Sequence, residues 1–166
     1  MKSKKSRRLI IIAAALLILT AAVYIVFPNG SDNGNSNQSD QIKTVEDADI
    51  VIPISSITEN ATFYPAIMNG TKLEVIALKA SDGTIRTAFN TCQVCYNSGR
   101  GYYEQEDNEL VCQNCGNRFG MDAVEVTRGG CNPVPITDEN ITVEGEFITI
   151  PKEFLTQASV IFQNWK

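Results

Sequence analysis

The 166-residue sequence contains no histidine. This absence removes the imidazole general base and the Ser-His and Cys-His nucleophile pairs, and no other catalytic constellation is visible, so the sequence does not favour an enzyme. It also leaves sulfur, with or without carboxylate, as the donor for any metal site. With only 6 prolines and 11 glycines, a collagen-like or proline-rich chain is excluded as well.

Acidic residues are missing from the N-terminal part of the chain. All 19 lie after residue 30, whereas five of the 14 cations lie within residues 1–8. The body of the protein is therefore strongly acidic, and an acidic surface does not hold DNA or RNA phosphates through counterion release. We expect no nucleic-acid partner.

Charge is also absent from residues 9–27, a run of 19 mainly apolar residues. A helix of this length spans about 28 Å, close to the roughly 30 Å hydrocarbon core of a bilayer. The cations in residues 1–8, with none directly after the run, predict a cytoplasmic N-terminus and a C-terminal domain outside the cell membrane. The sequence thus predicts a single-pass signal anchor. The alternative is a cleaved signal peptide, although the apolar run is long for one.

The remaining chain divides into a linker and a domain. Residues 28–41 are almost all Asn, Gly, Ser, Asp and Gln, a composition that predicts a flexible linker, and residues 42–166 then form the extracytoplasmic domain. Alternating or apolar runs bounded by turn residues predict a mainly β domain. Only residues 152–165 have an apolar stripe at helical spacing, which predicts a C-terminal helix packed on the core. The predicted strands and hairpin segments cover residues 50–54, 72–79, 84–89, 102–105, 109–112 and 141–150.

The five cysteines are the strongest functional signal. Sixteen residues that read as a hairpin separate the pair Cys92 and Cys95 from the pair Cys112 and Cys115. Two thiolates spaced by two residues can face one ion, and a hairpin brings the two pairs together into a tetrahedral sulfur site. Gly116 supplies the positive φ that such a turn needs. Zinc, a single iron or an iron–sulfur cluster all fit thiolate ligation.

Structural disulfides are the alternative, because extracytoplasmic proteins form them. Five cysteines cannot all pair, however, and a thioredoxin-like redox site requires a βαβ context that is absent here. Cys131 lies in a Gly-Gly-Cys-Asn-Pro turn and is a fifth ligand, a spare thiol or a packed residue. We expect its sulfur within about 8 Å of the other four, from where it would act as an exchangeable ligand or tune the site.

The segment from Phe63 to Pro135 resembles the membrane iron–sulfur containing FtrD-like family. The resemblance rests on FYPAIMNGTKLEVIALKASDGTIRTAFNTCQVCY, GRGYYEQEDNELVCQNCGNRF and RGGCNPVPI. It implies a membrane-attached, cysteine-rich domain that holds an iron–sulfur centre and is associated with iron transport, so that an iron permease complex is an expected partner. The functional residues that it implies are Cys92, Cys95, Cys112, Cys115 and Cys131.

A weaker resemblance is to Rieske domains. These share a strand ending in Asp-Gly, two metal-binding loops around a hairpin, and a later proline-rich loop. Rieske centres use two histidines, however, and Cys95 and Cys115 stand at those positions here. The fold class predicted for the domain is therefore Rieske-like or zinc-ribbon-like. The matching positions are Asp82-Gly83, Cys92, Cys112, Gly116–Phe119 and Pro133–Pro135.

Two functions from different classes follow. The first is a membrane-anchored iron–sulfur protein that acts in electron transfer as an accessory to iron transport. The second is a structural zinc-ribbon-like module, in which the metal only folds the domain and the function lies in binding a membrane-protein partner.

Overall fold

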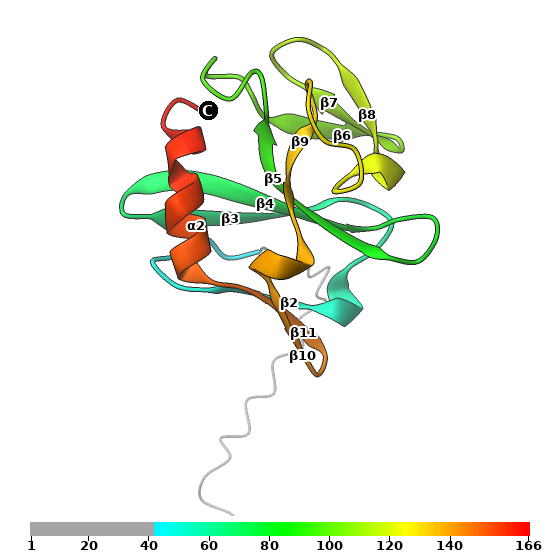
Figure 1. The fold of residues 1–166 in the computed structure, drawn as a ribbon, viewed down its shortest axis with the longest axis vertical. Helices are drawn as coiled ribbons and strands as arrows, with labels where there is room; N and C mark the ends of the chain where they lie inside the picture. Colours follow the sequence, from blue (N-terminus) through cyan, green and yellow to red (C-terminus); the bar gives the residue numbers. More distant parts are fainter. Residues whose placement is uncertain (1–41) are drawn as a thin grey trace, which may run out of the picture. The chain divides into compact units, whose positions relative to one another are not determined.

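A computed structural model of the chain describes residues 42–166 (Figure 1). The predicted cytoplasmic segment 1–8, transmembrane helix 9–27 and linker 28–41 all lie outside the described residues. Within residues 42–166, none of the helices has the length and apolar character needed to cross a bilayer.

The described part of the chain is mainly β, as predicted, and its strands form three sheets. The sheets have the strand orders β1-β3-β4-β5-β9, β10-β11-β2 and β6-β7-β8. All pairs are antiparallel except β1 and β3. The strands are β1 Val45–Glu46, β2 Ile50–Pro53, β3 Thr62–Met68, β4 Thr71–Lys79, β5 Ile85–Cys92, β6 Tyr103–Glu106, β7 Glu109–Cys112, β8 Arg118–Gly120, β9 Pro133–Ile136, β10 Thr142–Glu144 and β11 Phe147–Ile150. The helical segments are η1 Ile54–Ser56, η2 Met121–Ala123, η3 Asp138–Asn140, α2 Lys152–Ala158 and η4 Ser159–Phe162.

Strand β4 lies in the middle of the five-stranded sheet and is buried on both faces. Side chains alternate along a strand, so Leu73, Val75 and Ala77 enter one core while Ile76 and Leu78 enter another. We call these two clusters the hydrocarbon core and the cysteine core. The nearly continuous apolar run of β4 is therefore explained by its position between them.

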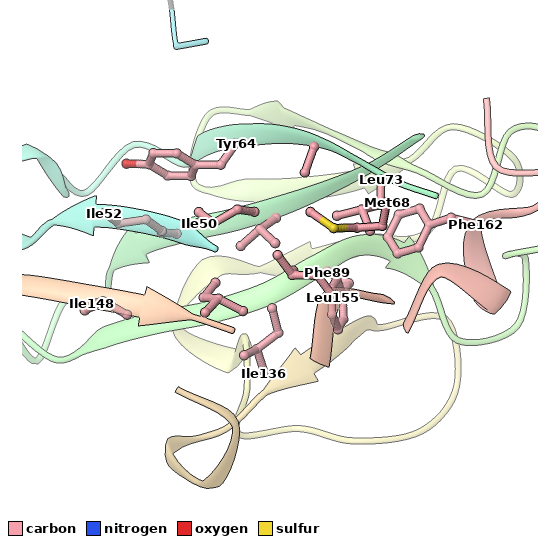
Figure 2. Close-up of a cluster of buried hydrophobic side chains, with 14 of the residues drawn as sticks. Ile50, Ile52, Tyr64, Met68, Leu73, Phe89, Ile136, Ile148, Leu155 and Phe162 are labelled. Carbon is pink, nitrogen blue, oxygen red and sulfur yellow. The ribbon is translucent and has the colours of Figure 1, made fainter. Parts of the chain in front are cut away.

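The hydrocarbon core lies between the five-stranded sheet, the β10-β11-β2 sheet and the C-terminal helical segments (Figure 2). Leu155 of α2 and Phe162 of η4 reach Phe89 of β5, and the Phe89 and Phe162 rings meet edge to face at 5.7 Å between centroids. Full burial of one such side chain contributes about 1.5–3 kcal/mol. This core fixes the sheet on which the cysteines are placed.

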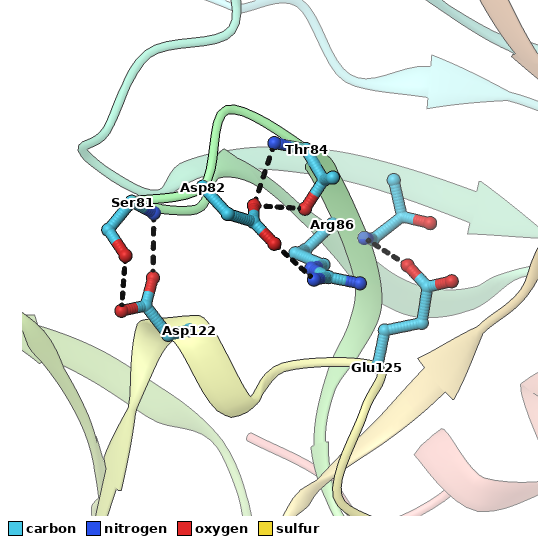
Figure 3. Close-up of polar contacts among 7 residues, drawn as sticks. Ser81, Asp82, Thr84, Arg86, Asp122 and Glu125 are labelled. Carbon is cyan, nitrogen blue, oxygen red and sulfur yellow. Dashed lines mark hydrogen bonds and ion pairs between the residues drawn. The ribbon is translucent and has the colours of Figure 1, made fainter.

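The cysteine core lies on the opposite face, between the five-stranded sheet and β6-β7-β8. It combines Tyr103, Leu110 and Phe119 with the sulfurs of Cys92 and Cys112. Polar contacts join the segment after β8 to the five-stranded sheet, which we call the central sheet (Figure 3).

Two carboxylates make these polar contacts. Asp122 of η2 accepts hydrogen bonds from the Ser81 N–H and hydroxyl at 2.7 and 2.8 Å, and Glu125 accepts one from the Thr87 N–H at 3.2 Å. The segment that follows β8 is thereby tied to the turn before β5 and to β5 itself.

Both predicted hairpins are confirmed, with Asp107 and Gly145 at positive φ in their turns. The predicted C-terminal helix is only partly confirmed, because α2 ends at Ala158 and continues as the 3₁₀ turn η4. The Ser159 hydroxyl donates to the Thr156 carbonyl at 2.7 Å, an alternative partner for the last-turn backbone. The apolar stripe nevertheless packs on the core as expected.

Four strands were not predicted: β1, β3, β8 and β9. Proline explains two of these omissions, β3 and β9. Pro65 interrupts the pattern of β3, yet it is tolerated because β1 pairs only with Ala66 and Ile67 and leaves Pro65 with one neighbouring strand. Strand β9 contains Pro133 and Pro135 and lies at the edge of the five-stranded sheet.

Candidate metal centre

Three chain segments bring the cysteines to one end of the domain. Cys92 ends β5, Cys112 ends β7, and Cys131 lies just before β9. Cys92 pairs with Pro133 in one sheet and Cys112 with Tyr103 in another, so each segment is fixed by sheet register. Figure 1 shows this end of the domain opposite the β10-β11 hairpin.

The five sulfurs fall into two groups of three. The Sγ atoms of Cys92, Cys95 and Cys112 all lie within 4.8 Å of one another, and so do those of Cys95, Cys115 and Cys131. Cys95 belongs to both groups. The first group is buried, whereas in the second Cys115 is exposed and Cys131 half-buried.

This grouping refines the predicted site of Cys92, Cys95, Cys112 and Cys115. The structure brings these four cysteines together. It also places the Cys131 sulfur in the same group as those of Cys95 and Cys115. The Cys131 sulfur lies within 4.8 Å of those of Cys95 and Cys115, one from each pair, so the expected distance of about 8 Å is confirmed for these two sulfurs. All five cysteines are free thiols in the structure, and their role as ligands stays a prediction.

The first cysteine pair is held in a tight turn. The Cys95 N–H points at the Cys92 sulfur at 3.3 Å, and the Cys92 N–H donates to the Gly101 carbonyl at 2.7 Å. Gly101 touches the turn so closely that an added Cβ would lie 2.2 Å from the Cys95 carbonyl oxygen. Only glycine fits there, and no pattern in the sequence distinguished it from its neighbour Gly99.

The second cysteine pair has a more open turn. The Gly116 N–H donates to the Cys112 carbonyl at 2.8 Å, and Gly116 has a φ of 71°, as predicted. An added Cβ at Gly116 would meet nothing within 4 Å, so this glycine serves backbone conformation rather than packing. Cys115 is left facing solvent.

The loop carrying Cys131 is fastened to both pairs. Gly129 and Gly130 have φ of 85° and 67°, and the Gly129 N–H donates to the side-chain oxygen of Gln93 at 3.1 Å. The Cys131 carbonyl accepts the Tyr103 hydroxyl at 2.8 Å and the Asn117 side-chain amide at 3.4 Å. Cys131 is therefore positioned by contacts of its own backbone.

A buried asparagine joins the two sheets below the sulfurs. The side-chain amide of Asn90, in β5, accepts the Tyr103 N–H at 2.7 Å and donates to the Tyr103 carbonyl at 3.2 Å. The backbone carbonyl of Asn90 accepts the Trp165 indole N–H at 2.6 Å. These contacts replace a direct strand pairing between β5 and β6. An asparagine inside an alternating strand gave no sequence signal for this role.

Two of the thiols are acidified. Burial opposes ionisation of Cys92, but the neighbouring Tyr103 side chain and nearby N–H groups such as that of Cys95 leave its pKa below the ordinary thiol value. The pKa of Cys115 is lowered above all by the N–H of Asn117. One thiol in each group therefore has a pKa below that of an ordinary cysteine.

The other three thiols resist ionisation. Burial raises the pKa of Cys95 to about 11 and that of Cys112 to about 12. The contact with Cys115, followed by burial, raises the pKa of Cys131 to about 11. A bound cation would deprotonate its thiol ligands, because negative sulfurs this close together need positive charge between them.

The donor set fits an iron–sulfur group. Such clusters are held by four cysteine thiolates, and a structural zinc site also takes four. Five thiols are available, and backbone N–H groups such as that of Cys95 point toward sulfur, the arrangement that stabilises thiolate charge.

Comparisons with known proteins agree with this donor set. A family model described as "Membrane iron-sulfur containing protein FtrD-like" matches residues 56–162, more than half of the chain. No curated protein matches the chain.

Two solved structures show a distant likeness, both of the quaternary ammonium Rieske monooxygenase CntA. The inhibitor complex is 15% identical with a TM-score of 0.41, over 65% of this chain and 32% of that one. The L-carnitine complex is 17% identical with a TM-score of 0.40, over 69% and 39%. The match thus covers between about a third and two fifths of those proteins.

Proposed function

The chain belongs to the FtrD-like family of membrane iron–sulfur proteins, as its cysteine motifs predicted, and from this premise we propose that residues 42–166 hold an iron–sulfur cluster and carry electrons for iron transport. The observation that carries the proposal is the gathering of five sulfurs into two groups that share Cys95. Among residues 42–166, these two cysteine groups are the sets of side chains close enough together to hold a metal ion.

The residues of the site divide into an inner and an outer part. A bound cluster would supply one-electron redox chemistry. Cys92 and Cys112 would hold it from the buried side, where Tyr103 and the cysteine core exclude water. Exposed Cys115 and half-buried Cys131 would leave its outer edge close to solvent, where electrons can be exchanged with a partner.

The cofactor is tested on protein purified from its native host. We expect colour, iron and acid-labile sulfide, all lost together in a variant with Cys92 and Cys112 replaced by serine. The matched control replaces exposed Val143 and Val160 by serine and keeps all three. Colourless protein with one zinc per chain would overturn the proposal.

The location is part of the same proposal. Residues 9–27 would anchor the protein in the cell membrane, with residues 42–166 outside and next to an iron permease. Protease added to intact cells should then remove the domain, while a cytoplasmic marker protein survives. Protection of the domain until the cells are lysed would contradict this topology.

A structural zinc-ribbon-like module is the second candidate. It is favoured by the burial of Cys92 and Cys112 within the cysteine core, since a metal bound there would fold β6-β7-β8 onto the central sheet. Binding to a membrane-protein partner would then be the function. The same purification separates the two candidates, because only the first requires iron and sulfide.

A further inference from the structure

The surface around the cysteines differs in charge from the rest of the domain. None of the 19 acidic residues lies in the three segments that carry cysteines, residues 91–103, 111–117 and 126–137. These segments do contain Arg100 and Arg128, which are exposed and form no ion pair among residues 42–166. The three segments therefore carry two positive charges and no negative one, within an otherwise acidic domain.

Two of the three carboxylates on strands β6 and β7 are neutralised by an arginine. Glu106 and Glu109 of the β6-β7 hairpin both bind Arg118, at 2.8 and 2.6 Å. They pair with each other at the end of the hairpin away from Cys112. Glu104 is the remaining carboxylate on these strands.

Hydrogen bonds hold the three segments together as one surface. The Gln93 N–H donates to the Asn132 carbonyl at 3.0 Å, and the Gln93 side chain accepts the N–H of Gly129, next to Arg128. On the other side, Gly101, next to Arg100, touches the Cys95 carbonyl. Each arginine thus immediately precedes a glycine that contacts the turn of the first cysteine pair.

The middle of this surface is apolar. Val94 and Tyr96 flank Cys95 and are 62% and 40% exposed. Exposed Cys115 belongs to the same sulfur group as Cys95. We call Val94, Tyr96 and Cys115, together with Arg100 and Arg128, the cysteine face. An apolar centre with a charged rim is the usual composition of a weak, transient protein interface.

We propose that the cysteine face docks an electron-transfer protein that presents carboxylates around its own redox centre. This proposal rests on the proposed function and names the partner of the same site. The two arginines attract such a partner, while the acidic remainder of the domain repels it, so encounters are steered to the face where the sulfurs are most exposed. The orientation brings the two redox centres close without a large interface.

The charge of the face is tested with small redox probes. The full chain in neutral detergent is reduced and then oxidised by anionic hexacyanoferrate(III) or by cationic tris(phenanthroline)cobalt(III), each over a range of ionic strength. Although the protein is acidic overall, we expect the anionic reaction to slow as salt is added. Replacing Arg100 and Arg128 by Glu should slow the anionic reaction about tenfold at low salt and leave the metal content unchanged.

The matched control carries the same change of charge elsewhere. Lys43→Glu with Lys152→Glu alters two exposed lysines outside the three segments and should change the anionic rate much less. An anionic rate that rises with salt in the unaltered protein, or equal effects of the two double variants, would overturn the proposal.

A second measurement does not depend on bound metal. In the reduced, metal-free chain, exposed Cys115 should react faster with an anionic aromatic disulfide than with a cationic aliphatic one, once both rates are corrected for a free thiol. The arginine variant should reverse that preference. A chain without iron would refute the proposed function alone, whereas no preference in either measurement would refute this inference.

Discussion

The two faces of the central sheet are packed by different chemistry. One face packs against aliphatic and aromatic side chains, and Met68 contributes the one sulfur atom of its buried cluster. The other face meets Cys92, Cys95 and Cys112 beside Tyr103 and Leu110. Burial alone stabilises the first core, whereas buried thiols gain most when a metal joins them. We therefore expect substitutions in the second core, and not those in the first, to change metal binding.

The largest effect should come from removing a buried sulfur. Cys112→Ser should release the bound metal and destabilise β6-β7-β8 by several kcal/mol, the scale expected when a structural metal is lost. Metal analysis and thermal unfolding measure the two effects. A variant with full metal stoichiometry and an unchanged Tm would show that Cys112 is not a ligand.

The opposite core offers the reverse experiment. Leu155 is fully buried, so Leu155→Ala should lower the free energy of unfolding by about 2–5 kcal/mol through lost burial and the cavity left behind. Metal content of the folded variant should be unchanged. Loss of metal from folded Leu155→Ala protein would mean that the two cores are not separable.

A smaller effect is expected where the first cysteine turn meets Gly101. Gly101→Ala would force a Cβ against the Cys95 carbonyl and should cost about 1–3 kcal/mol, with faster metal loss. Gly120→Ala is the matched control, because Gly120 has a φ of −62° and open space around it. Equal unfolding free energies for the two variants would contradict the contact.

The pH dependence of metal binding should reflect the thiols that are protonated in the metal-free protein. Burial raises the pKa of Cys95 to about 11 and that of Cys112 to about 12, so both hold protons in the metal-free protein at neutral pH. Metal binding must displace these protons, and affinity should therefore rise with pH by about 1.4 kcal/mol per pH unit for each proton released. Calorimetry in buffers of different ionisation enthalpy counts the protons. Binding without proton release would contradict these pKa values.

The smallest effect is expected at the fifth thiol. Cys131→Ala should keep the metal, because four sulfurs remain, but alter its reduction potential or its rate of loss. Cys115→Ala, in the same sulfur group, is the comparison. If Cys131→Ala instead empties the site, Cys131 is one of the required ligands.

The sequence predicted the elements whose signals are local. The β6-β7 hairpin, the β10-β11 hairpin and the convergence of two cysteine pairs all follow from turn residues and short spacings. Strand β3 was missed because it contains Pro65. A proline is acceptable there only because β1 pairs with Ala66 and Ile67 and not with Pro65, and this pairing is not visible in the local sequence.

The site was predicted by its sulfurs but not by its supports. Asn90, Tyr103 and Gly101 act through contacts with residues distant in sequence or through a single close approach, and neither leaves a periodic pattern. The position of Cys131 was expected, whereas its membership in a group with Cys95 and Cys115 required the fold.

Strand β4 has a consequence of its own, because it forms a wall of both cores. Its amide groups cannot open to solvent without disturbing packing on each side. A metal bound among the cysteines stabilises the closed state by RT ln(1 + [metal]/Kd), and that free energy is shared by every residue that opens with β4. Hydrogen exchange at Val75, whose side chain faces away from the cysteines, should therefore slow as metal is added. Through β4, hydrogen exchange on the hydrocarbon side of the domain would therefore depend on whether metal is bound among the cysteines.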